Sequence, residues 1–217
     1  IENSTIEADG AFGHTRVSDQ GRLAVRGSRF VGNDGAVFVH GNARAAIHDS
    51  ELLDGGSSGV AVGESASVDV VGSTIAGHAG RGVWIDGDAS VDLTDNTIAG
   101  NEMGVWLTGA ATAFVTENRI HDNLHSGAVL LGTTRARFAR NEIAGNARNG
   151  VALADDSAAI LEDNVLRGNG LVGVLIVDAA AGTLERNTIT GSEAGVHLED
   201  QGTAQGVDNV FADNAQD

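Results

Sequence analysis

The apolar positions of this chain follow one short pattern that returns at nearly constant intervals. In each copy an Asn or Ser is followed, two residues later, by a large apolar residue that we call the anchor. The anchors are Ile6, Phe30, Leu52, Ile75, Ile98, Ile120, Ile143, Leu166, Ile189 and Phe211, and they lie 22–24 residues apart. A period of this length is typical of a solenoid, in which each repeat stacks on its neighbours.

A second motif, usually Gly-Val-x-(Leu/Ile/Val), begins 16 residues before each anchor from Phe30 onward. Its first residues are His14, Ala36, Gly59, Gly82, Gly104, Gly127, Gly150, Gly173 and Gly195. Variation in repeat length therefore falls between an anchor and the next Gly-Val motif. This pattern predicts that one corner of each coil absorbs insertions while the strands keep their register.

Within a repeat the apolar residues alternate with period two over short stretches, which predicts strands. Val83 and Ile85 alternate with Trp84, Val91 and Leu93 follow, and the anchor Ile98 completes the repeat. We therefore predict an all-β fold, a single-stranded right-handed parallel β-helix of about nine coils with three short strands per coil. The handedness follows from the rule for parallel crossovers. We expect residues 1–217 to form a single domain that is a fragment of a longer chain.

Polar residues of the repeat are predicted to stack from coil to coil. Those two positions before the anchors are Ser28, Ser50, Ser73, Asn96, Asn118, Asn141, Asn164, Asn187 and Asn209. Those three positions after the anchors are Asn33, Gly55, His78, Asn101, Asn123, Asn146, Asn169, Ser192 and Asn214. Asparagines at stacked turns hydrogen-bond along such a rod and tolerate left-handed backbone. We interpret both sets as structural.

The amino-acid composition limits the kinds of binding partner that we expect for this protein. The net charge is −17, with 30 acidic residues against 13 basic ones. Such a charge disfavours binding to nucleic acid and to anionic membranes. The chain has no cysteine, which excludes disulfides and thiolate metal sites. It has no apolar run of about 18 residues, so we expect no membrane insertion.

The repeats resemble those of a known superfamily. Asn96 to Asn101 followed by Gly104-Val-Trp-Leu107 is similar to the repeats of pectin-lyase-like right-handed β-helix proteins. The likeness is greatest to NosD-type repeats, a group associated with carbohydrate-binding proteins and sugar hydrolases. The resemblance implies a parallel β-helix and an enzyme site, where one exists, on the outer face of the sheet built by the Gly-Val strands.

The central outward column of that sheet is predicted to be largely apolar. It consists of Arg16, Phe38, Ala61, Trp84, Trp106, Val129, Ala152, Leu175 and His197. Phe38, Trp84 and Trp106 are the candidate binding residues, and the two indoles are expected to lie close enough to stack. An exposed apolar stripe indicates a partner. Three alternatives stay open: a missing segment, neighbouring domain or subunit covers it, the tryptophans form a platform for sugar rings, or the exposure is incidental, as scattered surface hydrophobic residues are normal.

The sequence gives weaker support for a catalytic site on the same face. Its candidate residues are His40, Asp86, His197 and Glu199, and they do not form a recognisable constellation. The Gly-His-Gly and Asp-Pro-His signatures of pectin hydrolases and alginate epimerases are missing. The alternative function is a polysaccharide lyase, hydrolase or epimerase with catalytic residues partly outside this fragment.

One acidic column is a candidate calcium site. Asp155, Asp178 and Asp200 occupy the same repeat position in three successive coils. Stacked carboxylates either form a solvated edge or recruit a hard cation such as Ca²⁺. The leading prediction is an extracellular, cell-surface or periplasmic β-helix that acts as a binding or scaffold module. Its partner would be a polysaccharide or another protein domain.

Overall fold

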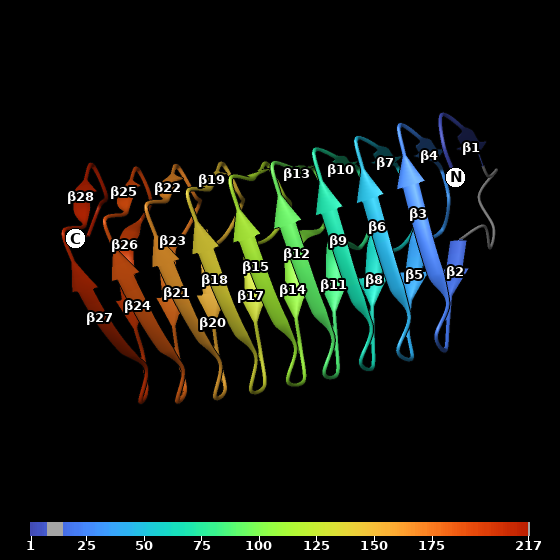
Figure 1. Ribbon diagram of the computed structural model, residues 1–217. Helices are drawn as coiled ribbons and strands as arrows, with labels where there is room; N and C mark the ends of the chain where they lie inside the picture. The colour runs from blue at the N-terminus through green and yellow to red at the C-terminus, as the bar shows by residue number, and fades with distance from the viewer. Residues whose placement is uncertain (8–14, 217) are drawn as a thin grey trace.

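The structure, a computed structural model, describes residues 1–7 and 15–216, which form a rod of stacked coils (Figure 1). Each full coil contributes one strand to each of three sheets, and every strand pair within them is parallel. The predicted fold class is confirmed. The first Gly-Val motif begins at His14, which lies outside the described residues. Within those residues no helix is long and apolar enough to cross a membrane.

Three sheets run along the rod. The anchor sheet consists of β1 Thr5–Glu7, β4 Arg29–Val31, β7 Glu51–Leu53, β10 Thr74–Ala76, β13 Thr97–Ala99, β16 Arg119–His121, β19 Glu142–Ala144, β22 Val165–Arg167, β25 Thr188–Thr190 and β28 Val210–Ala212. The Gly-Val sheet consists of β2 Thr15–Val17, β5 Val37–Val39, β8 Val60–Val62, β11 Arg81–Ile85, β14 Met103–Leu107, β17 Ala128–Leu130, β20 Val151–Leu153, β23 Val172–Ile176 and β26 Ala194–Leu198. The long-strand sheet consists of β3 Arg22–Arg26, β6 Arg44–His48, β9 Ser67–Val71, β12 Ser90–Thr94, β15 Thr112–Thr116, β18 Arg135–Ala139, β21 Ala158–Glu162, β24 Ala181–Glu185 and β27 Thr203–Val207.

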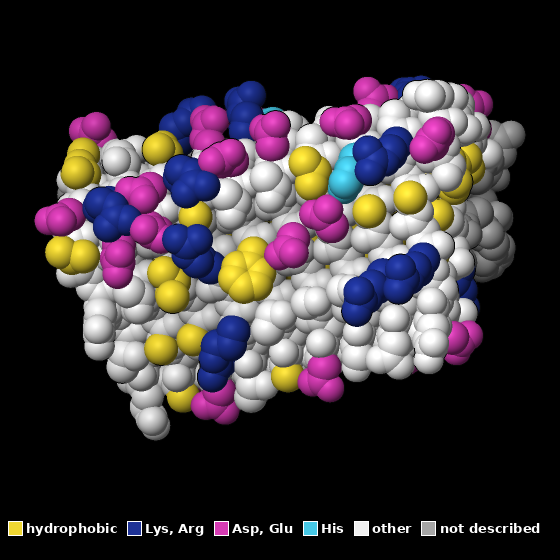
Figure 2. Space-filling model, viewed as in Figure 1, with side chains coloured by type: hydrophobic (Ala, Val, Ile, Leu, Met, Phe, Trp, Pro, Cys, Tyr) yellow, Lys and Arg dark blue, Asp and Glu magenta, His cyan; other side chains and the backbone are white. Residues whose placement is uncertain are grey.

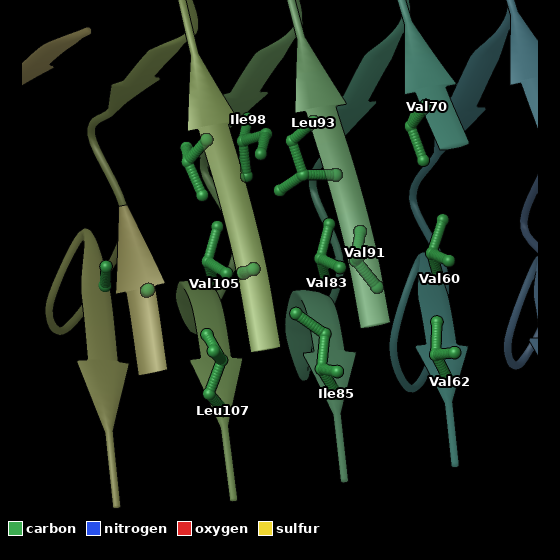
Figure 3. Close-up of a cluster of buried hydrophobic side chains, with 14 of the residues drawn as sticks. Val60, Val62, Val70, Val83, Ile85, Val91, Leu93, Ile98, Val105 and Leu107 are labelled. Carbon is green, nitrogen blue, oxygen red and sulfur yellow. The ribbon is translucent and has the colours of Figure 1, made fainter. Parts of the chain in front are cut away.

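The core is a column of mainly aliphatic side chains between the three sheets, and Figure 3 shows part of it. In one coil Val83, Ile85, Leu93 and the anchor Ile98 are all fully buried. Burying one such side chain contributes roughly 1.5–3 kcal/mol. Because side chains alternate along a strand, the residues between these inward positions face solvent. The predicted period-two pattern therefore decides which residues are available for function.

A tight turn between each long strand and the next anchor strand carries the stacked polar residues. Its first residue adopts left-handed backbone, as at Asp95 with φ of 55°. The following Asn96 is buried, and its Nδ2 donates to the carbonyl of Val70 at 2.8 Å and to Oδ1 of Asn118 at 3.0 Å. Its Oδ1 accepts from the backbone N–H of Ser73 at 2.9 Å. The predicted structural role of these asparagines is confirmed, because their side chains bind buried backbone groups of the preceding coil that would otherwise be unpaired.

Candidate functional site

The outward face of the Gly-Val sheet carries the predicted column in strict register. Phe38 lies beside Ala61, Ala61 beside Trp84, and Trp84 beside Trp106. The column continues through Val129, Ala152, Leu175 and His197. Phe38 and Trp106 are half-buried, whereas the Trp84 side chain is 37% exposed. The aromatic residues of this face are therefore gathered in the N-terminal half of the rod.

The small side chain of Ala61 leaves a depression between the rings of Phe38 and Trp84. Two adjoining cavities of about 340 and 210 Å³ meet there, and both are lined by Arg16, Phe38, Ala61 and Trp84. We call this depression the aromatic hollow. The backbones of Phe38 and Trp84 are two coils apart, which is roughly 10 Å. That separation leaves room for one flat, ring-shaped group above Ala61.

One wall of the aromatic hollow is a chain of polar contacts that fixes His40. Arg16 Nε donates to His40 Nε2 at 2.9 Å. Because Nε2 accepts, the proton of the neutral ring resides on Nδ1, which lies 3.8 Å from Glu64 Oε1. The Arg16 guanidinium also lies 5.2 Å from the ring centre of Phe38. Arg16 therefore orients both an aromatic ring and the imidazole beside it.

Asp86 lies on the same side of the aromatic hollow, next to the Trp84 indole. Thr108 Oγ1 donates to Asp86 Oδ1 at 2.7 Å and accepts from Trp84 Nε1 at 3.5 Å. The second carboxylate oxygen of Asp86 has no hydrogen-bond partner within the described part of the chain. His40 and Asp86 thus line one cavity, although no hydrogen bond or ion pair joins them there.

The two tryptophans do not stack on each other, contrary to the expectation from their positions in adjacent coils. Phe38 with His40 is the one close pair of aromatic rings in the described residues. Arg81 takes the place of a ring partner, with its guanidinium 4.1 Å from the Trp106 ring centre and 5.9 Å from that of Trp84. A guanidinium is attracted to the electron-rich face of an indole. Arg81 therefore covers Trp106 and leaves Trp84 as the exposed platform.

The other candidate residues of this sheet lie apart from the aromatic hollow. His197 is five coils from Trp84 along the same column, and Glu199 follows it. Both side chains are exposed, with His197 Nε2 4.0 Å from Glu199 Oε2. The fold therefore does not bring the four catalytic candidates into one site: it places His40 and Asp86 together and leaves His197 and Glu199 near the C-terminal end.

The three candidate calcium ligands share a column of left-handed turn residues, with φ between 55° and 57°. Asp155 Oδ2 accepts from the backbone N–H of Gly132 at 2.7 Å, and Asp178 Oδ2 accepts from that of Asp155 at 3.1 Å. Two of these carboxylates therefore bind backbone of the preceding coil. Across residues 1–7 and 15–216 no group of three or more His, Cys, Asp or Glu side chains is arranged to hold a metal ion. Calcium binding by Asp155, Asp178 and Asp200 stays a prediction.

The outer face of the long-strand sheet carries polar residues that the sequence reasoning missed (Figure 2). Strand register places Asp69 beside Asp92 and Asp92 beside Phe114, a side chain that is 58% exposed. His48 Nε2 lies 2.9 Å from Asp69 Oδ2. Burial raises the pKa of Asp92, and the neighbouring charge of Asp69 raises it further. The aligned repeats contain the signal, since Asp69, Asp92 and Phe114 each lie six residues before an anchor.

A shallow groove continues from Phe114 toward the C-terminal end of the same face. It has a volume of about 360 Å³ and runs across four coils, between a row containing Thr112 and Arg135 and a row containing Phe114 and Ile160. Figure 2 shows this face with basic, acidic and hydrophobic side chains interspersed. At one edge of the groove, Arg135 Nη1 donates to the backbone carbonyls of Thr133, Thr134 and Asp156, which belong to two neighbouring coils.

The three parallel sheets and their stacked coils define the class of protein as a parallel β-helix solenoid. The chain matches the family described as "Right handed beta helix region" over residues 1–102 and 58–215. It therefore belongs to that family, which confirms the predicted right-handed parallel β-helix superfamily. The likeness to NosD-type repeats stays a prediction. None of the curated protein sequences compared with it is similar enough to count as a relative.

Solved structures with the same fold act on polysaccharides. A double mutant of the periplasmic alginate epimerase AlgG is 16% identical with a TM-score of 0.79, over 97% of this chain and 68% of that one. The A-module of the mannuronan C-5 epimerase AlgE4 from Azotobacter vinelandii is 15% identical with a TM-score of 0.64, over 98% and 80% of the two chains. Pectate lyase Pel9A is 12% identical with a TM-score of 0.65, over 94% and 67%. At these identities the likeness shows the fold alone. In three further AlgG structures this chain spans 62% of the other chain's length.

Proposed function

We propose that this β-helix is a polysaccharide-binding module whose ligand lies on the Gly-Val sheet and places one sugar ring in the aromatic hollow. The observation that carries the proposal is the register Phe38, Ala61, Trp84, which sets two aromatic side chains on either side of a small one. Aromatic rings bury the apolar faces of ligand rings, and a few polar groups fix their orientation. Here those polar groups are the side chains of His40 and Asp86, with Ser57 on the opposite side.

The shape of the molecule supports a polymer as the ligand rather than a small metabolite. The hollow is open to solvent along the flat outer face of a sheet whose strands repeat about every 4.8 Å. A polysaccharide chain that lies along the rod axis would cross successive coils at this spacing. The polysaccharide-active proteins that share the fold agree with this choice, and we place the module outside the cytoplasm, in the periplasm or at or beyond the cell surface.

Native affinity electrophoresis tests the proposal. The strongly acidic protein migrates well, and a polymer cast into the gel retards a protein that binds it. We would cast separate gels with polygalacturonate, alginate, dextran and a β-glucan, and compare wild type with Trp84→Ala and Phe38→Ala. We expect at least one polymer to retard the wild type, and each variant to lose about tenfold or more in affinity, since aromatic stacking on a ligand ring is lost.

Phe114→Ala is the matched control, because it removes an exposed aromatic side chain from the long-strand sheet. It should retain wild-type retardation. Far-ultraviolet circular dichroism shows whether each variant keeps its β-helix. Wild-type retardation in folded Trp84→Ala and Phe38→Ala would remove the aromatic hollow from the binding site, and a lack of retardation of the wild type by every polymer would count against the function itself.

The second candidate function is turnover of the bound polymer, and the shared location of His40 and Asp86 in one cavity favours it. Asp86 has a carboxylate oxygen free to accept a proton, and the Nδ1–H of His40 can donate a hydrogen bond; epimerases, lyases and hydrolases need acid and base groups beside a sugar ring. Chromatography of the same polymers after incubation with the protein tests it. New products that disappear in His40→Ala and Asp86→Asn would establish an enzyme, whereas unchanged polymer leaves binding as the function.

A further inference from the structure

Arg81 differs from every other arginine of the described chain in its surroundings. The other twelve side chains are exposed, whereas Arg81 is half-buried. Its Nε has no hydrogen-bond partner within the described residues, and none of their carboxylates lies within ion-pair distance of its guanidinium. Withdrawing a cation from water is unfavourable, and contact with the Trp84 and Trp106 rings offsets this only in part.

The position of Arg81 places this charge at the edge of the aromatic hollow. The carbonyl of Arg81 accepts from the backbone N–H of Gly59 at 3.0 Å, so Arg81 adjoins Ser58, which lines the hollow. Three residues later in β11, Trp84 forms the aromatic wall. A ring stacked on Trp84 would therefore have the guanidinium beside it.

Glu102 lies on the coil next to Arg81, where its backbone N–H donates to the carbonyl of Gly80 at 2.9 Å, but none of the ion pairs among the described residues joins the two side chains. The acidic residues that line the aromatic hollow lie farther from Arg81. Glu64 and Asp86 line the cavity on the His40 side, at the opposite end of the strands. Asp34 lies on the same side as Arg81, but it belongs to the loop before β5, two coils away from β11. Because the whole chain carries a net charge of −17, an anionic ligand needs a local cation of this kind to be held.

We propose that Arg81 is an anion subsite of the aromatic hollow, which makes the ligand a polysaccharide whose sugars carry carboxylate or sulfate ester groups. The inference rests on the proposed function and names the ligand class of that same site. A sugar ring stacked on Trp84 presents its anionic substituent to the guanidinium, whose planar fork forms charge-assisted hydrogen bonds with either oxyanion. That anion supplies the ion-pair partner that Arg81 lacks among the described residues.

Matched pairs of polymers test the subsite. Native affinity electrophoresis would compare polygalacturonate with its carboxyl-reduced product, and dextran sulfate with dextran, so that each pair differs in the anionic group alone. The proteins are wild type, Arg81→Gln and Arg81→Lys. Arg44→Gln, an exposed arginine of the long-strand sheet, is the control for the change in net charge.

We expect wild type and Arg44→Gln to bind the anionic member of one pair more tightly. The pair that shows this preference identifies the anionic group of the ligand as carboxylate or sulfate. Arg81→Gln should lose about tenfold or more of the affinity for that polymer, as when one charge-assisted hydrogen bond is removed. Arg81→Lys should retain part of it. Equal retardation of wild type by both members of each pair would overturn the subsite while keeping the hollow as a glycan site. A preference that persists in Arg81→Gln would overturn it as well.

Discussion

Gly55 and His78 occupy two successive positions of the asparagine ladder that follows the anchors. His78 Nδ1 accepts from the backbone N–H of Gly55 at 3.2 Å, and His78 Nε2 donates to the carbonyl of Leu52 at 3.0 Å. The neutral imidazole thus accepts from one backbone N–H and donates to one backbone carbonyl, as the Asn101 amide does, but it makes no bond equivalent to the one from Asn101 Nδ2 to Asn123 Oδ1. The larger ring fits because Gly55 has no Cβ, which would lie 2.5 Å from Nδ1.

This relationship predicts a strong coupling between the two positions. Gly55→Asn should destabilise the fold by about 1–3 kcal/mol, because its side chain overpacks a buried site. The double variant Gly55→Asn with His78→Asn should recover most of that loss, since it restores the ordinary ladder. Equilibrium denaturation of the two single variants and the double variant gives the coupling energy. Additive effects would show that the imidazole and the glycine are independent.

The same histidine predicts a pH dependence of stability. Desolvation by burial lowers the pKa of His78 below its ordinary 6.5. In this range the unfolded chain binds a proton more readily than the folded one, so the free energy of unfolding falls as pH decreases below about 6.5. The contribution is fully present above that pH. Denaturation curves of wild type and the double variant between pH 7.5 and 5 should therefore diverge on acidification, because the variant has no histidine at this position. Parallel curves would contradict a buried neutral His78.

For Asp92 we predict a pH dependence of stability with the opposite sign. Its pKa is raised by burial and by the charge of Asp69 on the neighbouring strand, so the folded chain holds this proton to higher pH than the unfolded chain. Stability therefore falls as pH rises through the interval between the two pKa values. Asp92→Asn should stabilise the protein at pH 7 by about 0.2–1 kcal/mol, the usual size of a cross-strand charge effect. The gain should vanish once both carboxyl groups are protonated, and thermal melts at pH 7 and pH 3 measure it.

A substitution at Ala61 tests whether binding needs the open space of the aromatic hollow as well as its aromatic rings. Ala61→Leu fills the aromatic hollow from below while leaving Phe38 and Trp84 in place, so affinity for the polysaccharide should fall about tenfold or more. Ala152→Leu introduces the same change four coils away in the same outward column, and it should bind like the wild type. Both variants point away from the core and should melt near the wild-type temperature. Full binding by Ala61→Leu would mean that no ring enters the hollow.

The repeat in the sequence predicts the fold and the aromatic face because both depend on local alternation. It does not predict the place of Arg81. Counting back from the inward Val83 by two residues would put Arg81 in the core, but Gly82 faces inward instead. A Cβ there would lie 2.7 Å from Ile98 Cγ2. The backbone irregularity at a residue without a side chain turns Arg81 outward, between the two indoles.

The strand pattern of one repeat also does not predict the depth of the aromatic hollow or the pairing of Asp69 with Asp92. Both depend on which side chains meet across coils, since neighbours in the sheet are 22–24 residues apart in the chain. Aligning the repeats brings Asp69, Asp92 and Phe114 into one column, but their exposure and the raised pKa of Asp92 emerge from packing.

The most direct test of the account uses the two tryptophans, which give two indole N–H signals in a nitrogen–proton correlation spectrum. Trp84→Phe and Trp106→Phe assign them. Titration with oligosaccharides of the polymer that retards the protein should shift the Trp84 signal in a saturable way. The Trp106 signal should move less, because its Nε1 is buried and its ring lies under Arg81. Saturable shifts elsewhere in the spectrum with an unmoved Trp84 signal would contradict the account, because the ligand would then bind away from the aromatic hollow.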